Sequence, residues 1–388
     1  MDYRRSEVIG AATVRECSPA LGPAGDRVKE ATSPRDCRRI FIITHEGIGD
    51  LVFLIPTLRA LRDNLPGVRI MLAVSAIQKH LAGTLERSLV ETLPLDTHGL
   101  PYMVRAVRRF RPDVCFDFDG GLRHSAVALC SGASRRIHPP PELVKPYAAL
   151  VHREALPLNA GGHRVETLLA LLDMLGLKRT RISFDFPVPD EFQENAAWIS
   201  QRYIPPGSVA IIPASGTRWK DWPADSLQET IDILSRDLKR NVVLIARDRK
   251  YQGLRNVTDL SGRSNFLTDA YLLRYGGVFD VAVGVDTGMM QIAGSVDSDA
   301  HGSYSGVTGN RTVSLFGPTL ESIYRPYDPT GTLNLVVKPK VRSQAMGAVG
   351  WAGDRFERPY MRELDLREIV ESIERHLAAS RAGEPVQH

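Results

Sequence analysis

The most restrictive feature of the sequence is a repeated alternation of short apolar runs with segments of helical periodicity. Residues 39–44 (RIFIIT) form a β-branched and aromatic run, and a glycine turn joins it to 51–66, where apolar residues recur at helical spacing until Pro66. Further apolar runs occupy 68–75 and 114–119. Strands that alternate with helices predict an α/β domain with a parallel sheet covered by helices on both faces.

A second unit of the same kind follows an amphipathic helix at 163–177 and a stretch rich in proline. Its strands are expected at 208–215, 241–246, 279–286 and 312–317, and it ends in a helix at 366–380. The sequence therefore predicts two Rossmann-like domains that face each other across a cleft, where a ligand should bind at the carboxyl ends of the strands. The predicted boundaries are a poorly ordered extension at 1–37, a first domain at 38–185, a linker at 186–206 and a second domain at 207–388.

The composition excludes several classes of function. Lys and Arg number 49 against 45 Asp and Glu, and a net charge of +4 over 388 residues does not indicate nucleic-acid binding. No apolar run reaches the length of a membrane helix, and the charged N-terminus does not resemble a signal peptide, so a cytoplasmic location is expected. The four cysteines form no CxxC pair and the ten histidines no HExxH, so we expect neither a metal site nor a cofactor.

The first candidate site is the turn HEGIGDL at 45–51. Its glycines allow close approach of the backbone, and the helix that follows favours an anion at its N-terminus. It is not a dinucleotide fingerprint, because the third glycine is replaced by Val52. Asp50 is either a carboxylate that stabilises the first helical turn or a general base at the mouth of the cleft.

The second candidate is the loop GTRWKDWP, which places Lys220 between two tryptophans after a strand and before a helix. A lysine in this position can neutralise a phosphate. The alternative is a surface lysine beside Trp219 and Trp222, whose rings pack into the core.

The third candidate is VGVDTGMMQIAG, in which a buried strand ends at Asp286 and a helix starts at once. The backbone N–H groups of Thr287, Gly288 and Met289 would suit a diphosphate. The alternative is an ordinary turn in which Asp286 and Thr287 satisfy backbone donors. The DFD sequence at 117–119 is a weak candidate for a metal site, because Asp-x-Asp is common by chance.

Several segments in the same order resemble glycosyltransferase family 9, the bacterial heptosyltransferases of lipopolysaccharide core assembly. The resemblance covers about residues 38–380. It is carried by RIFIITHEGIGDLVFLIPTLRALRDNLPGVRI, RPDVCFDFDGGLRHSAVALCSGASRRI, HRVETLLALLDMLGL, IIPASGTRWKDWPADSL, VGVDTGMMQIAG and LFGPT.

The resemblance implies a GT-B fold and inverting, metal-independent transfer of a sugar from a nucleotide donor, typically ADP-heptose. Asp50 matches the family's proposed base and Lys220 its donor-phosphate lysine. The donor site is expected to include Ser215, Thr217, Asp286, Thr287, Gly288, Met289 and Gln291, and the acceptor side Gly49 and Arg123. The implied partners are a nucleotide-diphospho-sugar and a carbohydrate or lipid-linked acceptor, with possible peripheral contact at the inner membrane face. The segment 100–112 is the nearest candidate for this contact, and the alternative is that its cationic face is only solvated.

The sequence also departs from the family pattern. Gln291 stands where the family usually has a histidine, Asp248 is a poor match for its nucleobase-side glutamate, and the segment 295–312 is longer than usual and is expected to be mobile. Two alternatives therefore stay open. One is a transferase with another nucleotide-sugar and a small-molecule or peptidic acceptor, and the other is a non-catalytic relic that binds a nucleotide-sugar.

Overall fold

A computed structural model describes residues 37–44, 47–86, 88–138, 151, 154–156, 162–246, 251–299, 310–340 and 360–381. The predicted N-terminal extension, apart from Cys37, lies outside the described residues. So do Asp248 and the central part of the segment 295–312.

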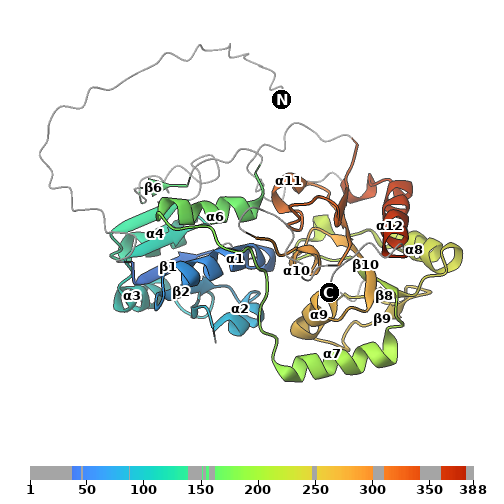
Figure 1. The fold of residues 1–388 in the computed structure, drawn as a ribbon, viewed down its shortest axis with the longest axis horizontal. Coiled ribbons are helices and arrows are strands. Elements are labelled where there is room, and N and C mark those ends of the chain that lie inside the picture. Colours follow the sequence, from blue (N-terminus) through green and yellow to red (C-terminus); the bar gives the residue numbers. More distant parts are fainter. Residues whose placement is uncertain are drawn as a thin grey trace, which may run out of the picture.

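The first domain is built on a six-stranded sheet in the order β3-β2-β1-β4-β5-β6, and every neighbouring pair is parallel (Figure 1). Its strands are β1 (Arg39–Ile43), β2 (Arg69–Val74), β3 (Glu91–Pro94), β4 (Val114–Asp117), β5 (Arg135–His138) and β6 (Glu154–Ala155). Its helices are α1 (Ile48–Asn64), α2 (Lys79–Glu86), α3 (Leu100–Phe110), α4 (Leu122–Cys130) and α6 (Arg164–Met174). The central strand β1 is apolar over nearly its whole length because helices cover both of its faces.

The second domain repeats this arrangement with a parallel sheet in the order β12-β11-β10-β7-β8-β9. Its strands are β7 (Ser208–Ile212), β8 (Val242–Leu244), β9 (Thr258–Asp259), β10 (Phe279–Val285), β11 (Thr312–Leu315) and β12 (Asn334–Val337). Its helical segments are η3 (Arg218–Lys220), α8 (Ala224–Asp232), the π-helical turn η4 (Ile233–Asp237), α9 (Phe266–Arg274), α10 (Gly288–Gly294), α11 (Glu321–Tyr324), η6 (Tyr360–Arg362) and α12 (Leu366–Arg381).

Counted within its own domain, each sheet has the strand order 3-2-1-4-5-6, which confirms the prediction of two Rossmann-like domains. In this topology the strand order reverses between the first and fourth strands, and ligands bind outside the carboxyl ends at that point. The two switch points lie between β1 and β4 and between β7 and β10. The turns singled out from the sequence follow three of these four strands.

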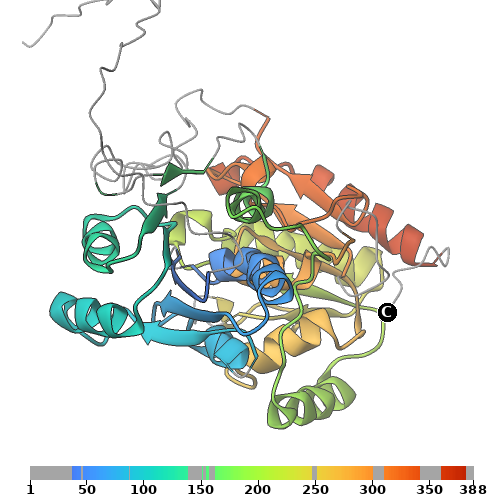
Figure 2. The ribbon, with the colours of Figure 1, turned by 60° about the vertical axis from the view of Figure 1, so that its left-hand side comes forward.

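The segment predicted as a linker contains a 14-residue helix, α7 (Asp190–Tyr203). It begins after Pro189 with two acidic residues in its first turn, which the positive end of a helix favours. Ala196 and Ile199 are buried on its inner face, where α7 packs on α9. Figure 1 shows α7 below both sheets, and Figure 2 shows the chain crossing from α6 to reach it.

The two domains are joined by a continuous apolar core. The cluster that contains β1, α1 and α6 extends to Phe266, Ile292 and Tyr327 of the second domain. Just before α7, the chain is fastened to the second domain by an antiparallel bridge between Ile182 and Ser298. The junction is therefore packed, and the loops at the two switch points are held close to one another.

A fully buried ion pair lies at this junction. The Asp297 carboxylate accepts hydrogen bonds from Arg274 Nη2 at 2.9 Å, the Phe184 backbone N–H at 3.0 Å and the Ser183 hydroxyl at 3.1 Å. The side chains of Asp297 and Arg274 are both 0% exposed. Because Ser183 and Phe184 precede α7, the pair fixes the crossing chain to the second domain.

Candidate active site

The turns after β1 and β10 meet backbone to backbone. Gly288, the first residue of α10, has no room for a side chain, because a Cβ there would lie 2.7 Å from Ile48 Cβ and 2.8 Å from the Gly49 nitrogen. Gly49 in turn faces Gly288 and Gln291. Of the predicted residues, Gly49 on the acceptor side and Gly288 on the donor side are thus direct neighbours.

Asp50 lies in the first turn of α1, beside this contact. Its side chain turns back toward the start of the helix, since a Cβ on Gly47 would approach Asp50 Oδ2 to 2.8 Å. The other oxygen, Oδ1, lies 3.8 Å from Nε of Arg164, the first residue of α6. The Asp50 side chain is 23% exposed, so the carboxylate is reachable from solvent.

Asp286 is the centre of a polar cluster at the carboxyl end of β10. Its Oδ2 accepts hydrogen bonds from Lys220 Nζ and from the Thr319 hydroxyl, each at 2.8 Å, and Oδ1 lies 3.5 Å from the Gln291 amide nitrogen. The carboxylate is 9% exposed and the lysine side chain 19%. These hydrogen bonds hold the carboxylate in place, and the carboxylate in turn fixes the position of Lys220.

The loop that carries Lys220 is shaped by its own hydrogen bonds. The Ser215 hydroxyl donates to the Thr217 carbonyl at 2.8 Å and accepts from the Thr217 N–H, while the Ser215 N–H donates to Asp221. Trp222 is buried in the core, whereas the Trp219 ring lies 5.6 Å from the lysine ammonium. Lys220 is accordingly a half-buried, paired cation and not a freely solvated one.

Gln291 is buried and bridges two segments of the second domain. Its amide nitrogen donates to the Tyr324 carbonyl in addition to facing Asp286. Thr287 caps α10 without a side-chain hydrogen bond, and Met289 is half-buried. The residue that replaces the histidine of the family pattern therefore supports the position of Asp286.

Sequence reasoning did not single out Tyr324, Thr319, Arg164 or His163 as site residues, although segments that contain the last three carry the family resemblance. Burial raises the pKa of the Tyr324 phenol, the carboxylates of Asp50 and Asp286 raise it further, and Arg164 opposes them. Tyr324 is thus close enough to sense charges from both domains. The LFGPT motif contains Thr319, but its contact with Asp286 joins positions 33 residues apart, which periodicity cannot reveal.

His163 fixes the start of α6 at the domain junction. Its Nδ1 accepts from the Val165 N–H, and its Nε2 lies 2.7 Å from the Arg325 carbonyl of the second domain. Burial lowers the pKa of His163 to about 4, so the ring is neutral at pH 7 and Nε2 carries the proton that it donates to Arg325. The ring also packs edge-on against Phe53 and Tyr327.

Arg123 lies on a different part of the first domain. Its Nη2 donates to the carbonyls of Leu95 and His98 at 2.7 and 2.8 Å, which ties the start of α4 to the loop before α3. The neighbouring DFD segment serves local turns. Asp117 accepts from the Gly120 N–H and the Ser125 hydroxyl, and Asp119 from the Gly121 N–H.

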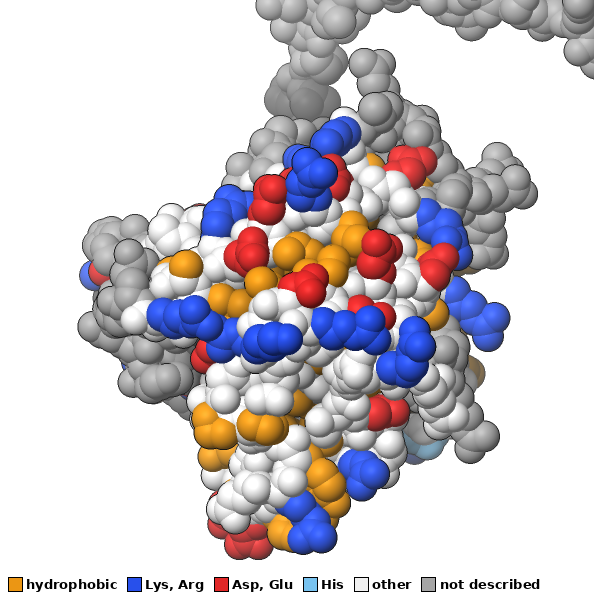
Figure 3. All heavy atoms as spheres, turned by 90° about the vertical axis from the view of Figure 1, so that its right-hand side faces the viewer, with side chains coloured by type: hydrophobic (Ala, Val, Ile, Leu, Met, Phe, Trp, Pro, Cys, Tyr) orange, Lys and Arg blue, Asp and Glu red, His pale blue; other side chains and the backbone are white. Residues whose placement is uncertain are grey.

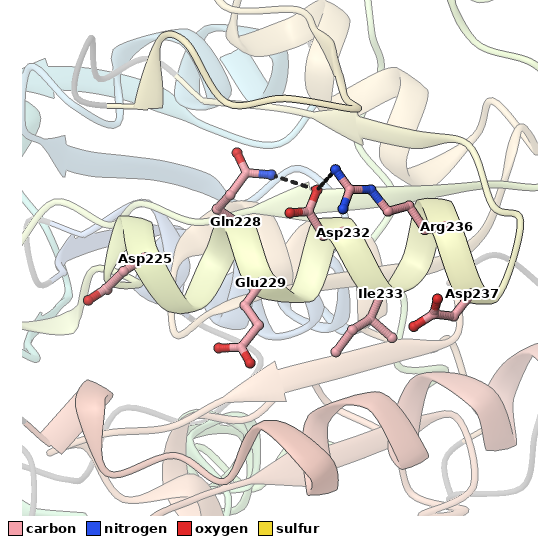
Figure 4. A pocket seen from close by; sticks show the side chains of 7 residues that line it. All are labelled: Asp225, Gln228, Glu229, Asp232, Ile233, Arg236 and Asp237. Carbon is pink, nitrogen blue, oxygen red and sulfur yellow. Dashed lines mark hydrogen bonds and ion pairs between the residues drawn. The ribbon is translucent and has the colours of Figure 1, made fainter.

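No group of three or more His, Cys, Asp or Glu in the described ranges could hold a metal ion. A hollow on the surface of the second domain is lined by Asp225, Gln228, Glu229, Asp232, Ile233, Arg236 and Asp237, all from α8 and η4 (Figure 4). It contains none of the predicted site residues. Figure 3 shows the face of the second domain that is on the right in Figure 1, where side chains of both charges surround a small apolar area.

A sequence model of glycosyltransferase family 9 (heptosyltransferase) matches residues 102–347, which is more than half of the chain. Among solved structures, the fold is similar to that of the family 9 glycosyl transferase from Veillonella parvula, with a TM-score of 0.66 and 16% identity over 88% of this chain and 97% of that chain. It is also similar to the ADP-heptose lps heptosyltransferase II of E. coli, with a TM-score of 0.61 and 15% identity over 88% of this chain and 99% of that one. The structure of the E. coli heptosyltransferase WaaC with ADP is similar with a TM-score of 0.58 and 16% identity, over 87% of this chain and 99% of that chain. Curated protein sequences gave no match.

Proposed function

Because the chain belongs to glycosyltransferase family 9, with the GT-B fold of that family, we propose that it transfers heptose from ADP-heptose to an acceptor hydroxyl with inversion at the anomeric carbon. The observation that carries the proposal is that the backbone contact between Gly49 and Gly288 brings the turn of Asp50 against the turn that follows Asp286, the partner of Lys220. These groups come from the switch points of two different domains, and the Gly49–Gly288 contact lies between them.

In the proposed reaction, Asp50 accepts the proton of the acceptor hydroxyl while its oxygen attacks the anomeric carbon. The bond from that carbon to the diphosphate breaks, and the electron pair leaves with the nucleoside diphosphate. Lys220 and the backbone N–H groups of residues 287–289 stabilise the charge that develops on the leaving group. Ser215 and Thr217 belong to the loop that carries Lys220.

The pairing of Lys220 with Asp286 has a consequence for donor binding. Lys220 Nζ lies 2.8 Å from Asp286 Oδ2, so a diphosphate that binds Lys220 shares the lysine ammonium with this carboxylate. Thr319 and Gln291 continue to donate to the carboxylate, so Asp286 keeps partners when the lysine turns to the phosphate. Each oxygen of the Asp286 carboxylate thus keeps a neutral donor while the lysine neutralises the phosphate.

The test of the donor is a panel of ADP-, UDP-, GDP- and CDP-linked sugars, measured by thermal shift and calorimetry. We expect selective stabilisation by an ADP-linked sugar. Lys220→Ala should weaken donor affinity roughly 10- to 100-fold, the value of a charge-assisted hydrogen bond. Lys340→Ala is the control, because it removes an exposed ion pair with Asp365.

Selection of a sugar linked to another nucleobase would support a transferase but contradict ADP-heptose as its donor. Gln291 favours this alternative, because a glutamine in place of the histidine removes a possible cation from the donor site. Unchanged donor affinity in Lys220→Ala would exclude the lysine from the site. Absence of binding by a folded sample would favour the non-catalytic relic.

We also propose that the acceptor is lipid-linked and that the first domain contacts an anionic membrane surface. In the part of the chain that the structure describes, no helix is long and apolar enough to cross a membrane. Six large apolar side chains are nevertheless exposed there, and four of them follow β2, β3 and β4 at the carboxyl edge of the first sheet. These four are Ile77, Leu100, Tyr102 and Leu122.

The loops that carry these side chains form one surface. The Ala76 N–H donates to Asp96, which joins the loops after β2 and β3, and Arg123 joins the loops after β3 and β4. Helix α3 starts at this edge with Leu100 and Tyr102 and contains no acidic residue; Arg105 follows one turn later, and Arg108 and Arg109 lie in its last turn. A helix with exposed apolar side chains at one end and an exposed cationic face is attracted by anionic lipid headgroups.

The expected result is co-sedimentation with phosphatidylglycerol vesicles and little with phosphatidylcholine vesicles. Changing Ile77, Tyr102 and Leu122 together to serine should weaken binding at least tenfold, since each buried apolar side chain contributes about 1.5–3 kcal/mol. Leu129→Ser with Trp198→Ser is the matched control, because both residues are exposed away from this edge. Equal binding by the wild type and the triple variant would contradict the proposal that this surface contacts the membrane.

A further inference from the structure

Among the described residues, the buried cation Arg164 has one distant ion-pair partner, Asp50, and no hydrogen bond to its Nε. The residue is 5% exposed, and its Nε is buried without a hydrogen-bond partner. Within the described ranges, Asp50 is the acid at ion-pair distance, but 3.8 Å from Oδ1 to Nε is too long for a hydrogen bond. Buried guanidinium groups are normally bound by several oxygen atoms, because unpaired buried donors are costly.

The surroundings of Arg164 are positive and rigid. Arg164 is the first residue of the 11-residue helix α6, and Asp50 is in the first turn of the 17-residue helix α1, so the positive ends of two helices converge here. His163, directly before Arg164, is held by the Arg325 carbonyl and by aromatic rings of both domains. The backbone that carries the guanidinium is therefore fixed relative to both domains.

We propose that Arg164 forms an anion-binding site beside Asp50 that takes a phosphate or carboxylate group of a bound substrate. The proposal rests on the proposed function, which places the reacting hydroxyl at Asp50. The planar fork of a guanidinium matches two oxygen atoms of such a group, and the neighbouring Asp50 carboxylate is partly exposed to solvent. Tyr324 of the second domain packs against the apolar cluster that contains α1 and α6.

This site is separate from the donor cluster. Lys220, Thr319 and Gln291 all bind Asp286, whereas Arg164 faces Asp50. The anion could belong to the donor, as a phosphate of the nucleotide, or to the acceptor, as a group next to the attacked hydroxyl. Both sources present the same chemistry to the guanidinium, and binding measurements distinguish them.

The experiment is calorimetry on the full chain with two probes, ADP and then inorganic phosphate added to the ADP-saturated protein. Arg164→Gln should lose at least tenfold in affinity for one of them. Weaker ADP binding assigns the site to the donor phosphates. Unchanged ADP binding with loss of phosphate binding assigns it to an anionic acceptor group.

Arg164→Lys keeps the charge without the fork and should recover part of the lost affinity. Arg179→Gln is the control. The Arg179 side chain is 35% exposed and pairs with Glu166, which lies on α6 as Arg164 does. The melting temperature of each variant shows whether the fold is intact.

The proposal is overturned if Arg164→Gln, folded as judged by its melting temperature, binds both probes as the wild type does. A displaced acid limb of the pH–rate profile with unchanged affinities would also overturn it, since Arg164 would then only position Asp50. The calorimetric readouts need no turnover with a heptose donor. A failure of the proposed reaction is therefore distinguishable from a failure of the anion site.

Discussion

Replacement of Asp50 by alanine is expected to lower turnover by roughly 10²- to 10⁴-fold, the usual contribution of a general base. The effect should fall on kcat more than on donor affinity, because Asp50 acts on the acceptor hydroxyl and the donor cluster lies on the second domain. Steady-state kinetics with a saturating nucleotide-sugar measure the first quantity, and calorimetry with ADP measures the second. Asp50→Asn should behave similarly, since an amide keeps the shape and loses the basicity.

The fold should tolerate this change. Asp50 forms no cap hydrogen bond at the start of α1, and a carboxylate in a first helical turn stabilises the helix by about 0.3–1 kcal/mol. Asp63→Asn on the same helix is the control, because its carboxylate contacts the Thr180 hydroxyl at the opposite end. Unchanged turnover in Asp50→Ala would mean that Asp50 only stabilises α1 and that the base lies elsewhere.

Replacement of Arg274 by methionine is expected to lower the free energy of unfolding by about 3 kcal/mol, the lower end of the loss for a broken buried ion pair. It removes the fully buried cation from Asp297, and the carboxylate keeps only the half-exposed Arg181, at 3.2 Å from Oδ2, with its neutral donors Phe184 N–H and Ser183 hydroxyl. Because the total stability of a domain is about 5–15 kcal/mol, the loss should be evident in urea unfolding. The crossing segment before α7 should also become more susceptible to proteolysis.

Two further variants test this interpretation. Arg362→Met breaks an ion pair with Asp225 in which both side chains are more than half exposed, and it should cost at most about 1 kcal/mol. The double variant Arg274→Met with Asp297→Leu should be more stable than Arg274→Met alone, because no charge is then left buried. A loss below 1 kcal/mol in Arg274→Met would show that water or another group compensates Asp297.

Sequence reasoning found the central strands and missed the peripheral ones. Strands β1, β4, β7 and β10 are apolar runs between turns because both of their faces are covered, and that pattern is visible in the sequence. Strands β6 and β9 have two residues each, too few for any periodicity. Helix α7 was missed because prolines on both sides of a polar helix resemble a linker.

The candidate site shows a similar division. Asp50, Lys220 and Asp286 could be singled out because each lies in a turn that follows a predicted strand. Arg164 and Tyr324 could not, since each makes its decisive contacts with residues far away in the sequence. Arg164 in particular looks like an ordinary polar residue at the start of an amphipathic helix, and only the packing of α6 on α1 buries it.

The contact between Gly49 and Gly288 also constrains how the two halves of the molecule can move. Backbone atoms that touch without intervening side chains act as a fulcrum, and a rotation displaces each atom in proportion to its distance from that point. Asp50 is next to this point, so any rotation about it would change the separation of Asp50 from Gly288 less than it would displace the outer loops. A rotation of this kind would widen the rim of the cleft for a large substrate while the reacting groups stay in register.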